Sequence, residues 1–181
     1  MPVTAEQIEI AKSQGMQNVE LIAQCCNETG ARFYIALAML EKETGTCRNV
    51  YGHDVGGALS GFPKPVTKDN YEVFKWLVFT KGQRSNGVGP SQLTFKGFFT
   101  DMESKGLKPY DMHDNIAYGV KLIQQYYRDG RNQGQSVNDA LRYAGTKYNG
   151  SPAYGDSFLT VALKWKARVG SADYIDSVQM S

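Results

Sequence analysis

The chain has 181 residues, of which 41% are hydrophobic and 21% are charged, and its formal net charge is +2. This composition excludes an intrinsically disordered chain and favours one globular domain with a substantial core. The charge is too balanced to indicate a nucleic-acid-binding surface, and no apolar run reaches the ~18 residues of a membrane-spanning helix, so we expect neither nucleic acid binding nor membrane insertion.

Helix signals recur in the first part of the chain. Residues 31–43 are apolar nearly all round, which indicates a helix at the centre of the domain. Two shorter helices precede it, and we expect residues 1–30 to form a helical extension that packs on a single domain covering residues 1–181. The signals for these two helices are a capping box at Thr4 and Gln7, a cap at Asn18, and stops at Gly15 and Gly30.

The middle third of the chain is rich in glycine and proline. Residues 44–68 and 82–93 show little periodicity, so we expect loops with a small β region such as a short hairpin. A helix beginning at Asp69 separates them, and another begins at Thr94 with Phe95 at the start of its apolar stripe. Further helices are predicted to begin at Asp111, Ser136 and Ala153, and the last of them ends near Arg168. The expected fold class is mainly α with a small β part (α+β), arranged around a central buried helix.

The three cysteines, Cys25, Cys26 and Cys47, are predicted to be buried free thiols. An odd number with an adjacent pair is a poor disulfide framework, and no histidine spacing suits a zinc site. We therefore expect no metal and no organic cofactor.

The end of the central helix carries the first candidate catalytic group. At about 100° per residue, Glu43 lies on the same side as Ala36 and Met39, whereas Glu41 projects to roughly the opposite side. A carboxyl group held against an apolar wall has its charged form disfavoured and its pKa raised, as acid-catalysed bond cleavage requires. The spacing alone also fits an exposed carboxylate at a helix end.

Two later segments offer partners for Glu43. Asp54 follows in a glycine-flanked loop and suits the second carboxylate of a glycosidase, or alternatively makes a loop hydrogen bond or caps a turn. The glycines and proline of residues 86–94 permit a ligand to approach the backbone closely, and Gln92 offers donors and acceptors for a sugar. Both this segment and the Asn149–Gly150 pair are also compatible with plain loops.

Four segments, in this order, resemble motifs of the lysozyme-like superfamily, which includes soluble lytic transglycosylases and goose-type lysozymes. The resemblance covers about residues 30–168 and is closest to a domain of bacteriophage endolysins and tail-associated proteins. Thr44 stands where the family has serine, Pro90 and Ser91 replace a Leu-Met pair, and the alanine of a Tyr-Asn-Ala-Gly motif is missing. The four segments are Glu43–Gly45, Gly89–Leu93, Asp114–Gly119 and Tyr148–Gly150.

The resemblance implies cleavage of the β-1,4 bond between N-acetylmuramic acid and N-acetylglucosamine in peptidoglycan, with Glu43 as the catalytic acid. It favours a lytic transglycosylase, whose product carries a 1,6-anhydro ring. A hydrolase that uses Asp54 as second carboxylate is the alternative. The residues expected to bind the glycan strand are Tyr51, Ser91, Gln92, Tyr148 and Asn149.

Two further alternatives stay open at this point: a non-catalytic wall-binding or phage-tail structural module, and an enzyme acting on chitin. The N-terminal residues 1–7 have neither the basic nor the apolar region of a signal peptide. We therefore expect a monomer that is made in a bacterial cytoplasm and acts at the cell wall, which it reaches through a separate pore protein or on a virion.

Overall fold

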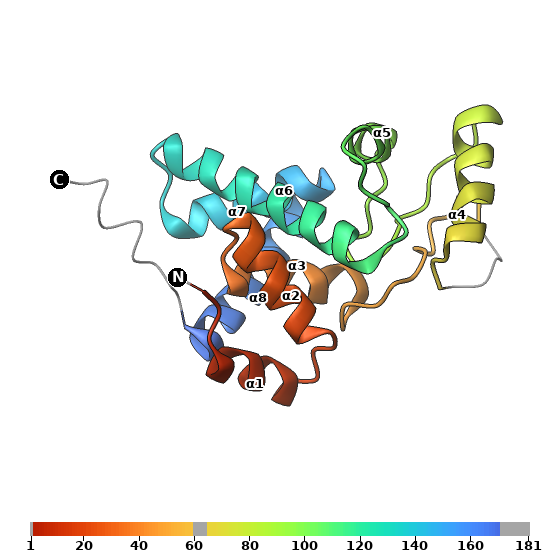
Figure 1. Ribbon diagram of the computed structural model, residues 1–181. Coiled ribbons are helices and arrows are strands. Elements are labelled where there is room, and N and C mark those ends of the chain that lie inside the picture. Colours follow the sequence, from red (N-terminus) through yellow and green to blue (C-terminus); the bar gives the residue numbers. More distant parts are fainter. Residues whose placement is uncertain (1, 60–64, 171–181) are drawn as a thin grey trace.

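A computed structural model of the chain describes residues 2–59 and 65–170. Within these ranges the chain forms eight α-helices and one π-helical segment, η1 (Figure 1). The elements are α1 (Ala5–Ser13), α2 (Val19–Thr29), α3 (Phe33–Thr44), α4 (Lys68–Lys75), η1 (Trp76–Thr80), α5 (Lys96–Ser104), α6 (Met112–Asn132), α7 (Val137–Asn149) and α8 (Pro152–Val169). The predicted mainly α class is confirmed. No helix of the described part is long and apolar enough to cross a membrane.

The expected small β region is reduced to isolated bridges. Two of them join Tyr51 to Val88 and Val88 to Leu93, and no longer strand is found in the described ranges. Side-chain amides take over part of the role of strand pairing, since Asn86 donates to the Gly52 carbonyl and accepts from the Leu59 amide. Part of the predicted hairpin region, residues 60–64, lies outside the described residues.

Buried side chains form two clusters. The large core combines residues from Ala11–Cys47 with residues from Ile116–Val169, and so draws on α1, α2, α3, α6, α7 and α8. The small core is built from one contiguous stretch, Tyr51–Met102, and includes aromatic rings of α4 and α5. Figure 1 shows α4 and α5 to one side of the bundle that surrounds α3. The site described below lies where these two parts meet.

Helix α3 is the centre of the large core, as predicted. Every residue from Phe33 to Leu40 is buried, and α2, α6 and α8 pack around it. Alanine, leucine and methionine in this run favour a helix, and burial of each large side chain contributes roughly 1.5–3 kcal/mol. The helix ends at Gly45, whose φ of +76° is unfavourable for other residues and whose amide donates to the Glu41 carbonyl at 2.9 Å. Glu43 is thereby fixed in the last turn.

Several helix starts follow their local signals. The capping box of Thr4 and Gln7 is confirmed, and the side chains of Asp111 and Ser136 cap α6 and α7 as predicted. Asn18 is the N-cap residue of α2, as predicted, but its side chain makes no capping hydrogen bond. This residue has a φ of +54°, and its side chain donates instead to the Cys47 carbonyl, 3.1 Å away.

Two starts in the middle third are displaced from their predicted positions. The side chain of Thr67, rather than that of Asp69, caps α4 and forms a capping box with Asn70. Helix α5 begins at Lys96, two residues after the predicted Thr94, and its N-cap Phe95 makes no side-chain cap.

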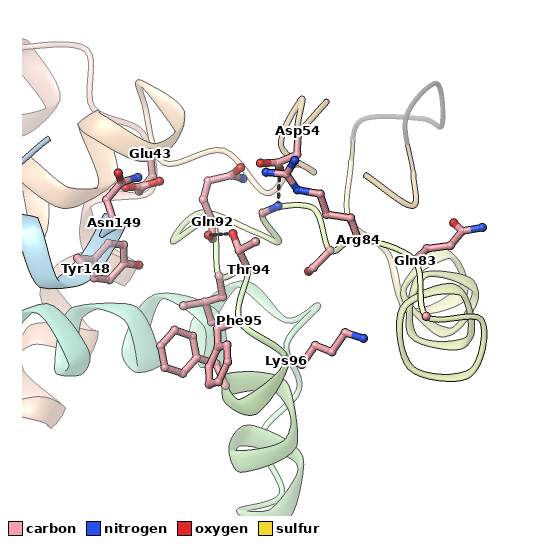
Figure 2. A pocket seen from close by; sticks show the side chains of 15 residues that line it. Glu43, Asp54, Gln83, Arg84, Gln92, Thr94, Phe95, Lys96, Tyr148 and Asn149 are labelled. Atoms are coloured by element: carbon pink, nitrogen blue, oxygen red, sulfur yellow. Dashed lines mark hydrogen bonds between the residues drawn. The ribbon is translucent and has the colours of Figure 1, made fainter. Parts of the chain in front are cut away.

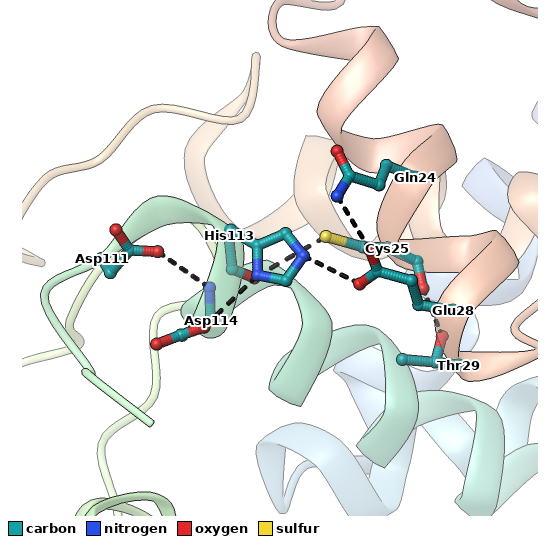
Figure 3. Close-up of polar contacts among 7 residues, drawn as sticks. All are labelled: Gln24, Cys25, Glu28, Thr29, Asp111, His113 and Asp114. Atoms are coloured by element: carbon teal, nitrogen blue, oxygen red, sulfur yellow. Dashed lines mark hydrogen bonds and ion pairs between the residues drawn. The ribbon is translucent and has the colours of Figure 1, made fainter. Parts of the chain in front are cut away.

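A histidine joins α2 to the start of α6 (Figure 3). The Nε2 atom of His113 lies 2.8 Å from a carboxylate oxygen of Glu28, and its Nδ1 atom lies 3.3 Å from Asp114 Oδ1. The Sγ atom of Cys25 reaches the His113 carbonyl, so the same turn of α6 is held from the core side. Hydrogen bonding to Asp114 and to Glu28 raises the pKa of His113 above its ordinary value of 6.5.

Candidate active site

A pocket of about 910 Å³ opens between the two cores (Figure 2). Its walls come from the last turns of α3 and α7, from the two irregular segments of the middle third and from the first turn of α5. Five of the predicted site residues line it together, although they are far apart in the sequence: Glu43, Asp54, Gln92, Tyr148 and Asn149.

Glu43 occupies a site where its two protonation states are close in free energy. Burial at the end of α3 is the largest effect and raises the pKa of this carboxyl group to about 7. The Tyr154 hydroxyl, which donates to Glu43 Oε1, and the nearby Lys42 ammonium lower this pKa, and the negative charge of Asp54 raises it. Desolvation prevails over these contributions, so a substantial fraction of Glu43 carries its proton near neutral pH.

Glu41 has a different environment on the opposite side of the helix. Its carboxylate pairs with the Lys164 ammonium and accepts a hydrogen bond from Trp165 Nε1 at 2.7 Å. Glu41 does not line the pocket. The helix-face argument that separated the two glutamates is confirmed, because only Glu43 points into the pocket.

Tyr154 is the residue nearest to Glu43 that the sequence analysis missed. It lies in the first turn of α8, and its ring stacks on Phe158 with a centroid distance of 6.4 Å. The Lys42 ammonium covers the ring of Tyr154, 4.8 Å from its centroid. A signal was available, because Tyr154 lies one turn before Phe158 and extends the apolar stripe of this helix backwards towards the pocket.

Asp54 lines the pocket from the first irregular segment. Its Oδ2 atom accepts a hydrogen bond from the Gly87 amide at 2.8 Å, which fastens this segment to the second one. The loop hydrogen bond considered for this residue is therefore present, although it joins two segments 33 positions apart. The Asp54 carboxylate also lines the same pocket as Glu43.

Gln92 shapes the pocket more than it offers donors to a ligand. Its φ is +47°, and its side-chain amide donates to the carbonyls of Val50 and Gly89 at 2.9 and 2.8 Å. Both amide hydrogens are thus engaged with the backbone. Of the two roles expected for this amide, only the carbonyl oxygen is left for a sugar.

Ser91 and Tyr51 are not part of the pocket lining, contrary to the prediction. Ser91 is fully buried, its hydroxyl donates to the Asn115 carbonyl at 3.0 Å, and its own carbonyl accepts from the Tyr148 hydroxyl at 2.6 Å. The Tyr51 hydroxyl donates to Asn70 at 3.0 Å and its ring packs in the small core. Both side chains use their polar atoms inside the protein, so neither serves as a sugar ligand.

The glycine at position 89 also has a role other than the predicted one. A Cβ atom there would lie 2.6 Å from the Asn115 side chain, so Gly89 makes room for that asparagine rather than for a ligand. Asn115 in turn donates to the carbonyls of Val88 and Pro109 and accepts from the Ser91 amide. This buried amide fixes the pocket segment on α6.

Ten further residues line the pocket without having been predicted as site residues, and four of them bear on what the pocket can bind. Phe95 was expected on the buried stripe of its helix, but 66% of it is exposed and its ring forms a wall of the pocket, edge-on to Phe98. An exposed aromatic ring next to polar side chains suits the apolar face of a sugar ring. The others are Arg84, Thr94 and Lys96.

One cluster of side chains has the composition of a metal site. Within the described ranges, one group of side chains, Asp111, His113 and Asp114, has ligand atoms close enough to share an ion. Asp111 and Asp114 accept hydrogen bonds from backbone amides, and His113 is bound to Glu28 and Asp114. None of the three lines the pocket, so this group stabilises the start of α6.

No protein-family model, no curated protein and no solved structure matches this chain.

Proposed function

We propose that the protein is a peptidoglycan glycosidase with a lysozyme-like helical fold, and that Glu43 is its catalytic acid. The observation that carries the proposal is a carboxyl group whose pKa is about 7, placed on the wall of an open pocket. A general acid works best when its pKa lies near the operating pH. The exposed ring of Phe95 and the polar ends of Gln92 and Asn149 give the same pocket the character of a sugar-binding cleft.

In the proposed reaction, protonated Glu43 donates its proton to the glycosidic oxygen while the bond from that oxygen to C1 of N-acetylmuramic acid breaks. The sugar then has oxocarbenium character. In a lytic transglycosylase its own C6 hydroxyl attacks C1 and returns a proton to Glu43, so no water is consumed. The Tyr154 hydroxyl, which donates to Glu43, stabilises the carboxylate that exists between these two proton transfers.

The position of Asp54 bears on how the reaction ends. One of its oxygens already accepts from the Gly87 amide, which supports a structural role and favours the single-acid mechanism. Its place in the same pocket lining as Glu43 keeps a hydrolytic ending as the second candidate, in which Asp54 directs a water to C1.

Substitution of Glu43 tests the proposed acid. We expect Glu43→Gln to reduce the clearing of a cell-wall suspension by about 10²–10⁴-fold, because the amide has no proton to donate at this oxygen. Glu41→Gln is the matched control on the same helix and should retain most of the activity. Loss of activity in the Glu41 variant with retention in the Glu43 variant would refute the assignment. If the wild type and the Glu43→Gln variant bound cell walls equally and the wild type released no products, the protein would be a binding module instead.

The products distinguish the two endings. We expect mass spectrometry of wild-type digests to show 1,6-anhydro muropeptides, which are one water lighter than hydrolysed ones, and Asp54→Asn to retain substantial activity. Reducing-end products in the wild type, combined with near-complete loss of rate in Asp54→Asn, would assign the role of base to Asp54.

A further inference from the structure

The pocket lining contains two cationic side chains that the proposed chemistry does not use. Figure 2 shows Arg84 and Lys96 on the side of the pocket away from Glu43 and Tyr148. Neither cation forms an ion pair with a carboxylate in the described part of the chain, whereas Lys105 is paired with an aspartate there.

Both side chains are oriented by neutral groups. The Arg84 guanidinium donates to the Val55 carbonyl at 3.3 Å, and the Lys96 ammonium donates to the Val78 carbonyl at 2.8 Å. The Lys96 ammonium also lies 5.8 Å from the centroid of the Phe79 ring. Backbone carbonyls and a ring position these groups without neutralising their charge, and guanidinium and ammonium groups keep several further donors.

We propose that Arg84 and Lys96 form a carboxylate-binding subsite, so that the preferred substrate is a glycan strand bearing acidic substituents. This inference rests on the proposed function and narrows its substrate class. A neutral polymer such as chitin would cover two cations without supplying a partner, and that desolvation is unfavourable. A peptidoglycan strand supplies carboxylates from two sources, the stem peptide and the lactyl group that is freed when the peptide is removed. Charge-assisted hydrogen bonds to either would fix the strand along the pocket.

Three substrates separate these possibilities: peptide-bearing strands, the same strands stripped of peptide, and N-acetylglucosamine oligomers. We expect the Arg84→Gln/Lys96→Gln double variant to lose about tenfold or more in kcat/KM on carboxylate-bearing strands, mainly through KM, with no change on the neutral oligomers. Glutamine keeps a donor for the Val55 and Val78 carbonyls, so the local fold is preserved. Lys108→Gln, which removes an exposed charge outside the pocket lining, is the matched control.

Two measurements keep this inference independent of folding and of activity. The KM of the wild type should rise with salt on peptide-bearing strands and stay constant on neutral oligomers. Strand binding by the Glu43→Gln protein should weaken when the two cations are also replaced, even if no strand is cleaved, in which case only the proposed reaction fails. Binding and KM that are identical with and without the cations, on all three substrates, would overturn the subsite. If replacing the two cations changes KM and binding more on peptide-bearing strands, the carboxylate comes from the stem peptide. If the change is larger on stripped strands, it comes from the lactyl group.

Discussion

Glu41 and Glu43 show how strongly one helix face differs from the next. The carboxylate of Glu41 forms an ion pair with Lys164, whereas that of Glu43, two residues later in α3, is a partly buried acid at a pocket wall. Helical geometry alone produces this difference, because about 200° of rotation separates the two side chains. The raised pKa of Glu43 affects stability as well as chemistry.

The first residue-scale prediction concerns Glu43 and the free energy of unfolding. Its pKa is about 7 in the folded chain against 4.5 as the ordinary value, so the folded state binds more protons between these limits. Stability must therefore decrease as the pH rises from about 4.5 through 7. The Glu43→Gln variant has no buried carboxyl group to ionise and should not lose stability in this way. We expect its melting temperature to exceed that of the wild type by roughly 5 °C at pH 8, with little difference at pH 4.

Calorimetry or thermal fluorescence between pH 4 and pH 8 measures this difference. Glu41→Gln is again the control and should show no such increase with pH. A Glu43→Gln curve that runs parallel to the wild-type curve would mean that the carboxyl group titrates normally.

The cysteines give a second prediction at this scale. All three are free and buried, as expected from the sequence, and burial raises the pKa of Cys25 and of Cys47 to about 12. Because the thiolate is the reactive form, a thiol reagent should count few groups in the native protein and three after denaturation. An intact mass two hydrogens below that of the reduced chain would instead indicate a disulfide.

At the scale of elements, His113 makes the contact between α2 and α6 dependent on pH. A neutral imidazole donates from one nitrogen only, whereas the protonated ring donates to both Glu28 and Asp114. Because the pKa of His113 is raised in the folded chain, the stability it provides is fully present below about 6.5 and is lost as the pH rises through the folded value. Asp111, the remaining carboxylate of this turn, accepts from the Asp114 amide.

Replacement of His113 tests this contact. We expect His113→Gln to lower the melting temperature by only roughly 2 °C at pH 5.5, because the ion pairs are partly exposed. The loss should be smaller at pH 8.5, because the ring of the wild-type histidine is then less protonated. Glu28→Gln should reproduce half of the effect through the α2 partner alone. A loss that is larger at pH 8.5 would show that the histidine acts through packing rather than through charge.

At the scale of the whole molecule, local features were predictable and long-range ones were not. Asp111 was identified as a helix cap from the sequence because its capping hydrogen bond spans only three residues. The side chain of Asn18 does not cap its helix because it donates to the Cys47 carbonyl, in a contact that no local pattern encodes. The helical stripe of α8 could have placed Tyr154 on the inner face of that helix, but its contact with Glu43, 111 positions away, is not encoded locally. The small β region was overestimated because amides such as Asn115 hold the loops without any periodicity.

The candidate site divides in the same way. Glu43 and its distinction from Glu41 follow from helical phase, which the sequence contains. Arg84 comes from an irregular segment and Lys96 from the start of α5, and only tertiary structure brings both to one pocket.

The division of the large core between the two ends of the chain sets the order in which a nascent molecule acquires its properties. The stretch Tyr51–Met102 is contiguous and can pack as soon as it is made, but α3 is enclosed only when α8 arrives. At about 5–20 residues per second, Tyr154 follows Glu43 out of the ribosome after roughly 6–20 s. Until then Glu43 is an ordinary solvated glutamate that has lost its proton at neutral pH. Under the proposed mechanism, a growing chain stays catalytically silent until α8 has been synthesised and has buried Glu43.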